Sequence, residues 1–330
     1  MKADVCRRRI PAVVLTLMLT GSLSAPQGMA QSSAPVVGVL TPSLFYASVL
    51  EGLRQGLLKL GYREGREIKL LVEDCRGDIT CFEPRAAKLV EAKPNVLFTM
   101  ATAPSMAVHK MAHSIPMVFS VVGDPVQAGL VANFASSGNS VTGVTSFSAP
   151  LSGKRLEILL EIAPKTSKVL ALVSAKENIS EFSFKHLAEA ARTLGVLILR
   201  RDVIDRSDIE KVLGEKWAGT ADAVYLVPSV LVSAHIEALI AKAKRERLPL
   251  NVYEDSQVDK GALVSYGGDF RSFGVQAAKL VVKILKGKKP ADIPVETPDR
   301  LFLAVNARTA ETIGLKIPDA ILERADKVVE

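Results

Sequence analysis

The second half of the chain repeats the order of apolar and turn-forming segments found in the first half. The segment GVLTPS at 38–43 aligns with ALVSAK at 171–176, an offset of 171 − 38 = 133 residues, and the helix-ending glycines Gly61 and Gly195 are 195 − 61 = 134 residues apart. Four matched elements share this spacing, which is typical of a duplicated structural unit. The repeat therefore predicts two similar lobes.

Each half alternates short apolar runs with amphipathic segments. Residues 35–40 form an apolar run, and Leu50, Leu53, Leu57 and Leu60 then recur at the spacing of one helix face. Parallel strands need long crossover connections, and helices supply them on both faces of a sheet. We predict an α/β fold made of two doubly wound parallel-sheet lobes.

The last part of the chain predicts that three segments cross between the lobes. A strand ends at Gly267 and Gly268, a long amphipathic helix follows at about 271–286, and one more strand and helix come after it. If that helix returns to the first lobe, lobe 1 comprises 34–145 with 269–299, and lobe 2 comprises 146–268 with 300–326. The crossings would lie near Thr145, Gly268 and Asp299. They would form a three-segment hinge, with Thr145, Gly267 and Gly268 as hinge residues, that opens and closes a cleft.

Residues 1–30 are typical of a secretory signal peptide. Basic residues precede an apolar run from Ile10 to about Leu23, and Gly28 and Ala30 suit cleavage after Ala30. The apolar run is shorter than the roughly 20 residues that span a bilayer, which disfavours a transmembrane anchor. We expect a soluble periplasmic protein.

The charge of the chain argues against nucleic-acid binding. Residues 1–30 carry four basic residues and one acidic one, so their removal lowers the formal net charge from +7 to 7 − 3 = +4. The remaining Lys and Arg residues are scattered, and the densest run, LKGKKP at 285–290, follows a predicted helix whose last carbonyls favour cations. We expect no nucleic-acid partner.

Two cysteines, Cys75 and Cys81, remain once the first of the three, Cys6, leaves with the signal peptide. In an oxidising compartment two close cysteines should pair, and the short ring that they close would stabilise the fold by about 2 kcal/mol. The alternatives are a metal pair or a redox pair, but the spacing is not C-x-x-C and no histidine lies within twenty residues. We expect a structural disulfide, no metal site and no cofactor.

Several longer segments occur in an order that is diagnostic in combination. They include EGLRQGLLKLGYREG, IPMVFSVVGDPVQAGLV, DSQVDKGALVSYGGDF and KGKKPADIPVET. Over residues 34 to about 325 this order resembles the ABC-transporter substrate-binding protein family whose characterised members take up aromatic amino acids. The resemblance implies a type I periplasmic-binding-protein fold. It also implies a monomeric, non-enzymatic protein that hands a small-molecule solute to a membrane permease driven by an ATPase.

Polar residues follow the predicted strands at their carboxyl ends, where ligands bind in open parallel sheets. The carboxylates of Asp124 and Glu254 can hold an ammonium group, and the hydroxyls and free amides at helix starts suit a carboxylate. Phe45, Tyr46 and Tyr266 could stack on a ligand. Together these groups fit a zwitterion. The expected ligand-binding residues are Thr41, Ser43, Ala101, Thr102, Gly123, Asp124, Ser174, Asn178, Ser229, Glu254, Tyr266 and Asp269.

Some of these residues have a structural alternative. Asp124 precedes Pro125 and could cap a helix that begins there, and Glu254 and Asp255 could likewise be caps.

Two other functional classes stay open. An enzyme could use His109 and His113 as metal ligands, but HKMAH lacks the Glu of H-E-x-x-H and no third ligand is evident. A periplasmic hydrolase built on Asp124 and Glu254 is a further form of this alternative. The other class is a ligand-sensing protein that docks on a membrane receptor.

Overall fold

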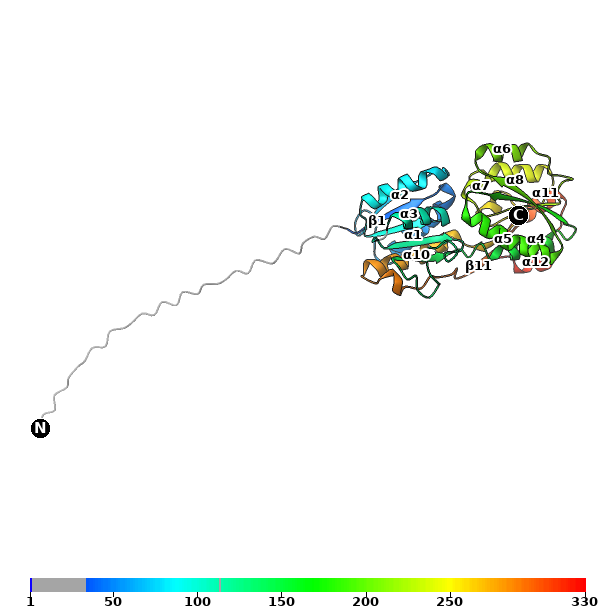
Figure 1. Cartoon of the computed structure of the whole chain (residues 1–330). Coiled ribbons are helices and arrows are strands. Elements are labelled where there is room, and N and C mark those ends of the chain that lie inside the picture. The colour runs from blue at the N-terminus through cyan, green and yellow to red at the C-terminus, as the bar shows by residue number, and fades with distance from the viewer. Residues whose placement is uncertain (2–33, 113) are drawn as a thin grey trace. The chain divides into compact units, whose positions relative to one another are not determined.

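The computed structural model describes Met1, residues 34–112 and residues 114–330 (Figure 1). Residues 34–330 form one compact unit. The predicted signal peptide and its cleavage site after Ala30 lie outside the described residues, as does His113. Among the helices of the described ranges, none is long and apolar enough to cross a membrane.

Lobe 1 is built on a five-stranded parallel sheet with the strand order β2-β1-β3-β4-β5. Three of its strands are buried along their whole length, as expected where helices cover both faces. The strands are β1 (Val36–Thr41), β2 (Lys69–Asp74), β3 (Val96–Met100), β4 (Met117–Val122) and β5 (Val141–Thr145). The helices are η1 (Leu44–Tyr46), α1 (Ala47–Lys59), η2 (Ile79–Cys81), α2 (Phe82–Glu91), α3 (Thr102–Met111), α10 (Phe270–Leu285) and η3 (Pro290–Asp292).

Lobe 2 is built on a seven-stranded sheet with the order β12-β11-β10-β9-β8-β6-β7. Its strands are β6 (Lys168–Ser174), β7 (Leu197–Val203), β8 (Ala223–Leu226), β9 (Leu250–Val252), β10 (Val264–Gly268), β11 (Leu301–Asn306) and β12 (Lys327–Val329). Its helices are α4 (Leu151–Ile162), α5 (Asn178–Leu194), α6 (Arg206–Gly214), α7 (Val230–Ala234), α8 (Ile236–Arg245), α9 (Asp255–Asp259), α11 (Ala307–Ile313) and α12 (Asp319–Arg324). Alternate residues of β6 belong to two different hydrophobic cores, one on each face of this sheet.

The structure confirms the predicted α/β fold with two doubly wound lobes. The order β7-β6-β8-β9-β10 in lobe 2 repeats the order β2-β1-β3-β4-β5 of lobe 1. Gly61 and Gly195, the glycines matched in the sequence, both follow a helix with positive φ angles of 88° and 71°. A left-handed residue ends a helix, and glycine adopts that conformation without steric cost. The shared spacing therefore reflects two equivalent helix ends.

Lobe 2 differs from a purely parallel sheet at one edge. Strand β11 runs antiparallel to β10, with Gly268 opposite Leu301. The chain leaves β10 toward lobe 1 and forms α10 there. It then returns to lobe 2 at the same end of the sheet that it left, so β11 runs in the opposite direction to β10. The final strand β12, which the sequence does not predict, pairs with β11.

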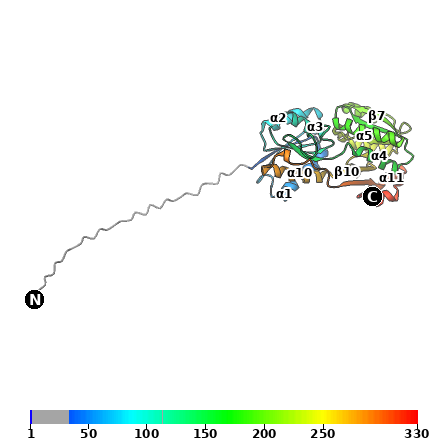
Figure 2. The same ribbon diagram turned by 60° about the horizontal axis from the view of Figure 1, so that its bottom comes forward.

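Helix α10 joins lobe 1 although it follows β10 of lobe 2 in the sequence. Phe273, Leu280 and Val281 lie in the same hydrophobic core as residues of β1, β3 and β4. The helix packs on α1, and both views show the two helices side by side (Figures 1 and 2). The chain thus passes between the lobes after β5, after β10 and before β11.

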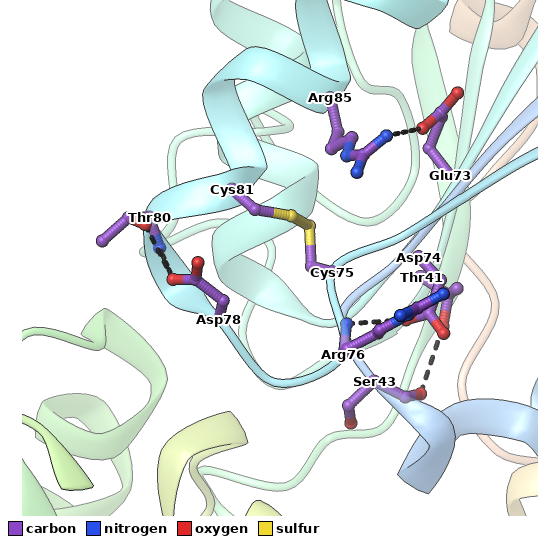
Figure 3. Close-up of a disulfide and its surroundings, with 10 residues drawn as sticks. All are labelled: Thr41, Ser43, Glu73, Asp74, Cys75, Arg76, Asp78, Thr80, Cys81 and Arg85. Carbon is purple, nitrogen blue, oxygen red and sulfur yellow. Dashed lines mark hydrogen bonds and ion pairs between the residues drawn. A yellow bond between two sulfur atoms is a disulfide. The ribbon is translucent and has the colours of Figure 1, made fainter.

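The predicted disulfide between Cys75 and Cys81 is present (Figure 3). It closes the loop between β2 and α2, and the amide of Gly77 in this loop donates a hydrogen bond of 2.8 Å to the carbonyl of Pro42. The same loop approaches lobe 2, since a Cβ atom on Gly77 would lie 3.3 Å from Cβ of Ala234 in α7.

Removal of this disulfide should cost stability without loss of the fold. A ring of this size restricts the unfolded chain by about 2 kcal/mol. We therefore expect the double variant Cys75→Ser/Cys81→Ser to lose about 2 kcal/mol in free energy of unfolding, measured by urea denaturation. A double variant as stable as the oxidised wild type would contradict this expectation.

Candidate functional site

A cavity lies where the two lobes meet. The empty space inside it is about 500 Å³, a figure that includes its opening to solvent. Lobe 1 lines it with residues of η1, β4, α10 and the start of α3. Lobe 2 lines it with residues of α4, α5 and α7 and of the loops before α5, α7 and α9. The first two crossing segments complete it. The lining residues are Tyr46, Ala101, Thr102, Ala103, Val121, Ser146, Ser148, Arg155, Glu177, Ile179, Pro228, Ser229, Val230, Tyr253, Gly268 and Phe270.

Two buried residues of opposite charge line this cavity. Arg155 on α4 is 1% exposed, and Glu177, which directly precedes α5, is 2% exposed. The Glu177 carboxylate accepts hydrogen bonds from Ser229 Oγ (2.6 Å) and from the amides of Val230 (2.8 Å) and Leu231 (3.1 Å) at the start of α7. The cavity therefore offers one cationic and one anionic group within an otherwise largely apolar wall.

Aromatic rings from both lobes form one side of the site. The Tyr46 and Phe270 rings stack with centroids 5.5 Å apart, and Phe45 meets Tyr253 of lobe 2 edge to face at 5.9 Å. Phe45 also contacts Tyr46 and Phe270 edge to face. Tyr46, Tyr253 and Phe270 line the cavity. Such rings can pack against an apolar or aromatic ligand group, or against an ammonium group.

The backbone is strained at two residues of the cavity wall. Ala101, between β3 and α3, has φ = 69°, and Val121, at an irregularity in the pairing of β4 with β5, has φ = 58°. A positive φ angle is costly for a β-branched residue, and residues of this kind concentrate at functional sites. At Ala101 the conformation turns the chain from β3 into α3, so that the start of α3 borders the cavity.

Only part of the predicted site reaches this cavity. Ala101, Thr102 and Ser229 line it, and Tyr46, expected to stack on a ligand, does so too. Thr41 and Ser174 are buried at strand ends outside it, and Ser43 borders a separate wide groove. Tyr266 takes part through its backbone carbonyl, which accepts a hydrogen bond of 2.6 Å from Arg155 Nε.

The predicted acidic residues lie outside the cavity lining, and two of them hold local structure. Asp124 Oδ1 accepts hydrogen bonds from the amides of Val126 (3.1 Å) and Gln127 (3.0 Å), in a turn and not in the helix expected at Pro125. Asp269 caps α10 through the amides of Arg271 and Ser272. Neither Asp124 nor Glu254 lines this cavity, where a hydrolase built on the two would need them.

Sequence reasoning missed the two charged residues of the cavity. Glu177 lies in the loop after β6, between Ser174 and Asn178, which the sequence does predict in the site. Arg155 lies four residues from both Leu151 and Leu159, which are buried on α4. A basic residue at the apolar spacing of a helix is the signal that could have identified it.

Glu254 is a buried carboxylate next to the site and should make stability depend on pH. Its pKa is raised to about 7, mainly by burial and also by the charge of nearby Asp255, whereas the hydrogen bond from Ser256 Oγ lowers it. In the unfolded chain the carboxyl group returns to the ordinary value of 4.5. Between these values the folded protein binds more protons than the unfolded chain, so stability falls as pH rises from about 4.5 to about 7.

We expect Glu254→Gln to remove this loss. The contribution is on the order of 3 kcal/mol, so the variant should be the more stable protein at pH 8 and gain little at pH 4. Urea denaturation of both proteins at the two pH values measures the difference. The same pH dependence in both would show that Glu254 does not titrate as described.

The lobes touch directly at the rim of the cavity. A Cβ atom on Gly123 of lobe 1 would lie 1.8 Å from Cδ1 of Ile179 in lobe 2, so the absence of a side chain at Gly123 permits the contact. Nearby, Asn178 Nδ2 lies 3.5 Å from Met106 Sδ of α3. These two contacts join lobe 1 to lobe 2.

The Gly123→Val substitution should hold the lobes apart. Its side chain would occupy the space of Ile179, so we expect a larger radius of gyration in small-angle X-ray scattering. The double variant Gly123→Val/Ile179→Ala is the matched control, because it restores the space and should return the wild-type value. A double variant as expanded as Gly123→Val would point to a cause other than this contact.

Comparisons with known proteins agree on one family. Residues 36–329 match the family described as ABC transporter substrate binding protein. The chain is 25% identical over 275 residues to a tyrosine-binding protein of Clostridioides difficile, covering 83% of this chain and 78% of that protein.

Solved structures show the same fold. A conserved domain protein of Vibrio cholerae is 28% identical, with a TM-score of 0.84 over 90% of this chain and 100% of that chain. An ABC domain from Streptococcus pneumonia in complex with L-Trp is 22% identical, with the same TM-score and coverage.

Proposed function

The chain belongs to the ABC transporter substrate-binding protein family, and from this premise we propose that its inter-lobe cavity binds an aromatic amino acid. The family consists of solute-binding proteins with the type I periplasmic-binding-protein fold, so the chain is a binding protein and not an enzyme. The observation that carries the proposal is the cavity itself, which is lined by both lobes and holds one buried cation and one buried anion.

The residues of the cavity suit the parts of such a ligand. Glu177 can accept a hydrogen bond from an ammonium group. Within the described part of the chain its Oε2 atom accepts one hydrogen bond, from the amide of Val230, and a carboxylate oxygen can accept more than one. Tyr46, Tyr253 and Phe270 provide a surface for an aromatic side chain. The curated relative is a tyrosine-binding protein, which supports an amino acid with a ring.

The fold suits capture and release. A ligand held by both lobes stabilises the contact between them. When the ligand leaves, the three crossing segments act as a hinge on which the lobes separate. The proposed hinge residues are Thr145, Gly267 and Gly268. We propose that lobe 1 comprises 34–145 with 269–299 and lobe 2 comprises 146–268 with 300–326. The closed monomer would then deliver its solute to a membrane permease and its ATPase. The expected signal peptide would place this exchange in the periplasm.

Isothermal titration calorimetry of the purified protein against the common amino acids tests this function. We expect L-tyrosine or L-tryptophan to bind at one site per chain and to be recovered unchanged. A ligand at 100 times its dissociation constant should also add about 2.7 kcal/mol of stability, visible as a higher unfolding temperature. Saturable binding of a sugar or polyol, with no response to any amino acid, would contradict the proposal.

A further inference from the structure

We infer that the Arg155 guanidinium binds the carboxylate of the ligand and ties that carboxylate to the first two crossing segments. The inference rests on the proposed function, since it names the ligand group that the same cavity recognises.

Arg155 is a buried cation whose charge is not balanced. Its Nε donates to the carbonyl of Tyr266 (2.6 Å), its Nη1 to the carbonyl of Ser148 (2.9 Å) and its Nη2 to Ser148 Oγ (3.1 Å). These partners are all neutral oxygen atoms, and within the described part of the chain no carboxylate forms an ion pair with Arg155.

A buried cation is costly without an anion beside it. Burial also lowers the pKa of Arg155, in keeping with the absence of a carboxylate partner. Because Arg155 lines the cavity, the natural counter-charge is an anionic group of the ligand. A guanidinium has five N–H donors, and beyond the three bonds named above Nη1 and Nη2 each keep one that can donate to a carboxylate.

The competing anion site of lobe 2 is already filled by the protein. A ligand carboxylate could accept hydrogen bonds from amides at the start of α7. The Glu177 carboxylate already accepts those of Val230 and Leu231, together with that of Ser229 Oγ. A ligand carboxylate placed there would meet the negative charge of Glu177. Within lobe 2, Arg155 is therefore the favourable position for the carboxylate, and Glu177 that for the ammonium.

The hydrogen bonds of Arg155 join two of the three crossing segments. Ser148 lies shortly after the crossing that follows β5, and Tyr266 lies in β10, two residues before Gly268, where the next crossing begins. The guanidinium also lies against that crossing, because a Cβ atom on Gly267 would be 3.4 Å from Nη2. A carboxylate bound to Arg155 would thus hold its guanidinium in the position where it bonds to both segments. Ligand binding would in this way stabilise one arrangement of the lobes.

The test compares L-tyrosine with L-tyrosinamide, in which a neutral amide replaces the carboxylate. By calorimetry we expect the wild type to prefer L-tyrosine by about 100-fold, and Arg155→Gln to reduce this preference to about threefold or less. Arg155→Lys keeps the charge but loses the planar fork, so it should lower the preference by about fivefold. A purely structural role would lower the unfolding temperature and leave the ratio of affinities unchanged.

Scattering adds a readout for the crossing segments. Saturating L-tyrosine should reduce the radius of gyration of the wild type and have a smaller effect on Arg155→Gln. Equal compaction of both proteins would overturn the link to the crossing segments. If Arg155→Gln does not fold, Arg155→Lys takes its place, and an unchanged affinity ratio in that variant contradicts the inference.

The outcomes separate this inference from the proposed function. Equal wild-type affinity for L-tyrosine and its amide overturns the role of Arg155 and leaves amino-acid binding intact. If the wild type binds neither L-tyrosine nor L-tyrosinamide, 3-phenylpropionate is the probe that tests the role of Arg155, since it carries a carboxylate without an ammonium group. Saturable binding of that probe that Arg155→Gln or Arg155→Lys weakens supports the inference, and no binding overturns it.

Discussion

The Gly52→Ala variant should lose about 3 kcal/mol in free energy of unfolding. Gly52 lies in α1 where that helix crosses α10, and a Cβ atom there would be 2.0 Å from the carbonyl oxygen of Arg271 and 3.2 Å from the amide nitrogen of Val275. These are backbone atoms, so no change of rotamer relieves the clash and the helices must separate. From the partner helix, a Cβ atom on Gly274 would likewise lie 2.0 Å from the carbonyl oxygen of Val49.

Gly214→Ala is the matched control for this prediction. Gly214 ends α6 with no atom within 4 Å of the position of a Cβ, so the same substitution should be neutral or stabilise by up to about 1 kcal/mol. Urea denaturation measures both variants. If Gly52→Ala is as stable as Gly214→Ala, α10 does not pack on α1 as described, and the return of the chain to lobe 1 is in question.

The Glu177→Gln variant should bind L-tyrosine about 100-fold more weakly than the wild type, a loss of roughly 3 kcal/mol. The amide has nearly the shape of the carboxylate but lacks its charge. It also cannot accept all three hydrogen bonds from Ser229, Val230 and Leu231 at once, because one of its two polar groups is a donor. The ammonium of the ligand would then face a neutral group in a buried site.

Glu189→Gln provides the same change of charge on α5, the helix that Glu177 directly precedes. The Glu189 side chain is 54% exposed and outside the cavity lining, so its loss should leave the affinity within about twofold of the wild type. Calorimetry on both variants, after a check of their unfolding temperatures, gives the comparison. Wild-type affinity in Glu177→Gln would show that the carboxylate serves only to cap α7.

The fold could be predicted from the sequence because it is repeated locally. The matched glycines Gly61 and Gly195 end equivalent helices, and the apolar runs of β1 and β6 begin equivalent lobes. The pairing of Cys75 with Cys81 could also be predicted, because the short ring that it closes depends little on the rest of the fold. The antiparallel β11 was harder to predict, because its direction depends on where the chain re-enters lobe 2.

The site could be predicted only in part because it depends on which strand ends meet across the lobes. Ala101, Thr102 and Ser229 follow strands and line the cavity. Asp124 also follows a strand, but its carboxylate bonds to amides two and three residues away, a local use that sequence spacing alone cannot separate from a ligand contact. Arg155 lies on a helix and not at a strand end, so a search of strand ends could not find it.

A crystal structure of the protein grown with the amino acid that binds most tightly tests the central claim most directly. Electron density for that ligand should lie in the inter-lobe cavity, with its carboxylate at Arg155, its ammonium at Glu177 and its ring beside Tyr46 and Phe270. Density for the ligand in the separate groove that Ser43 borders, with the inter-lobe cavity empty, would contradict the account.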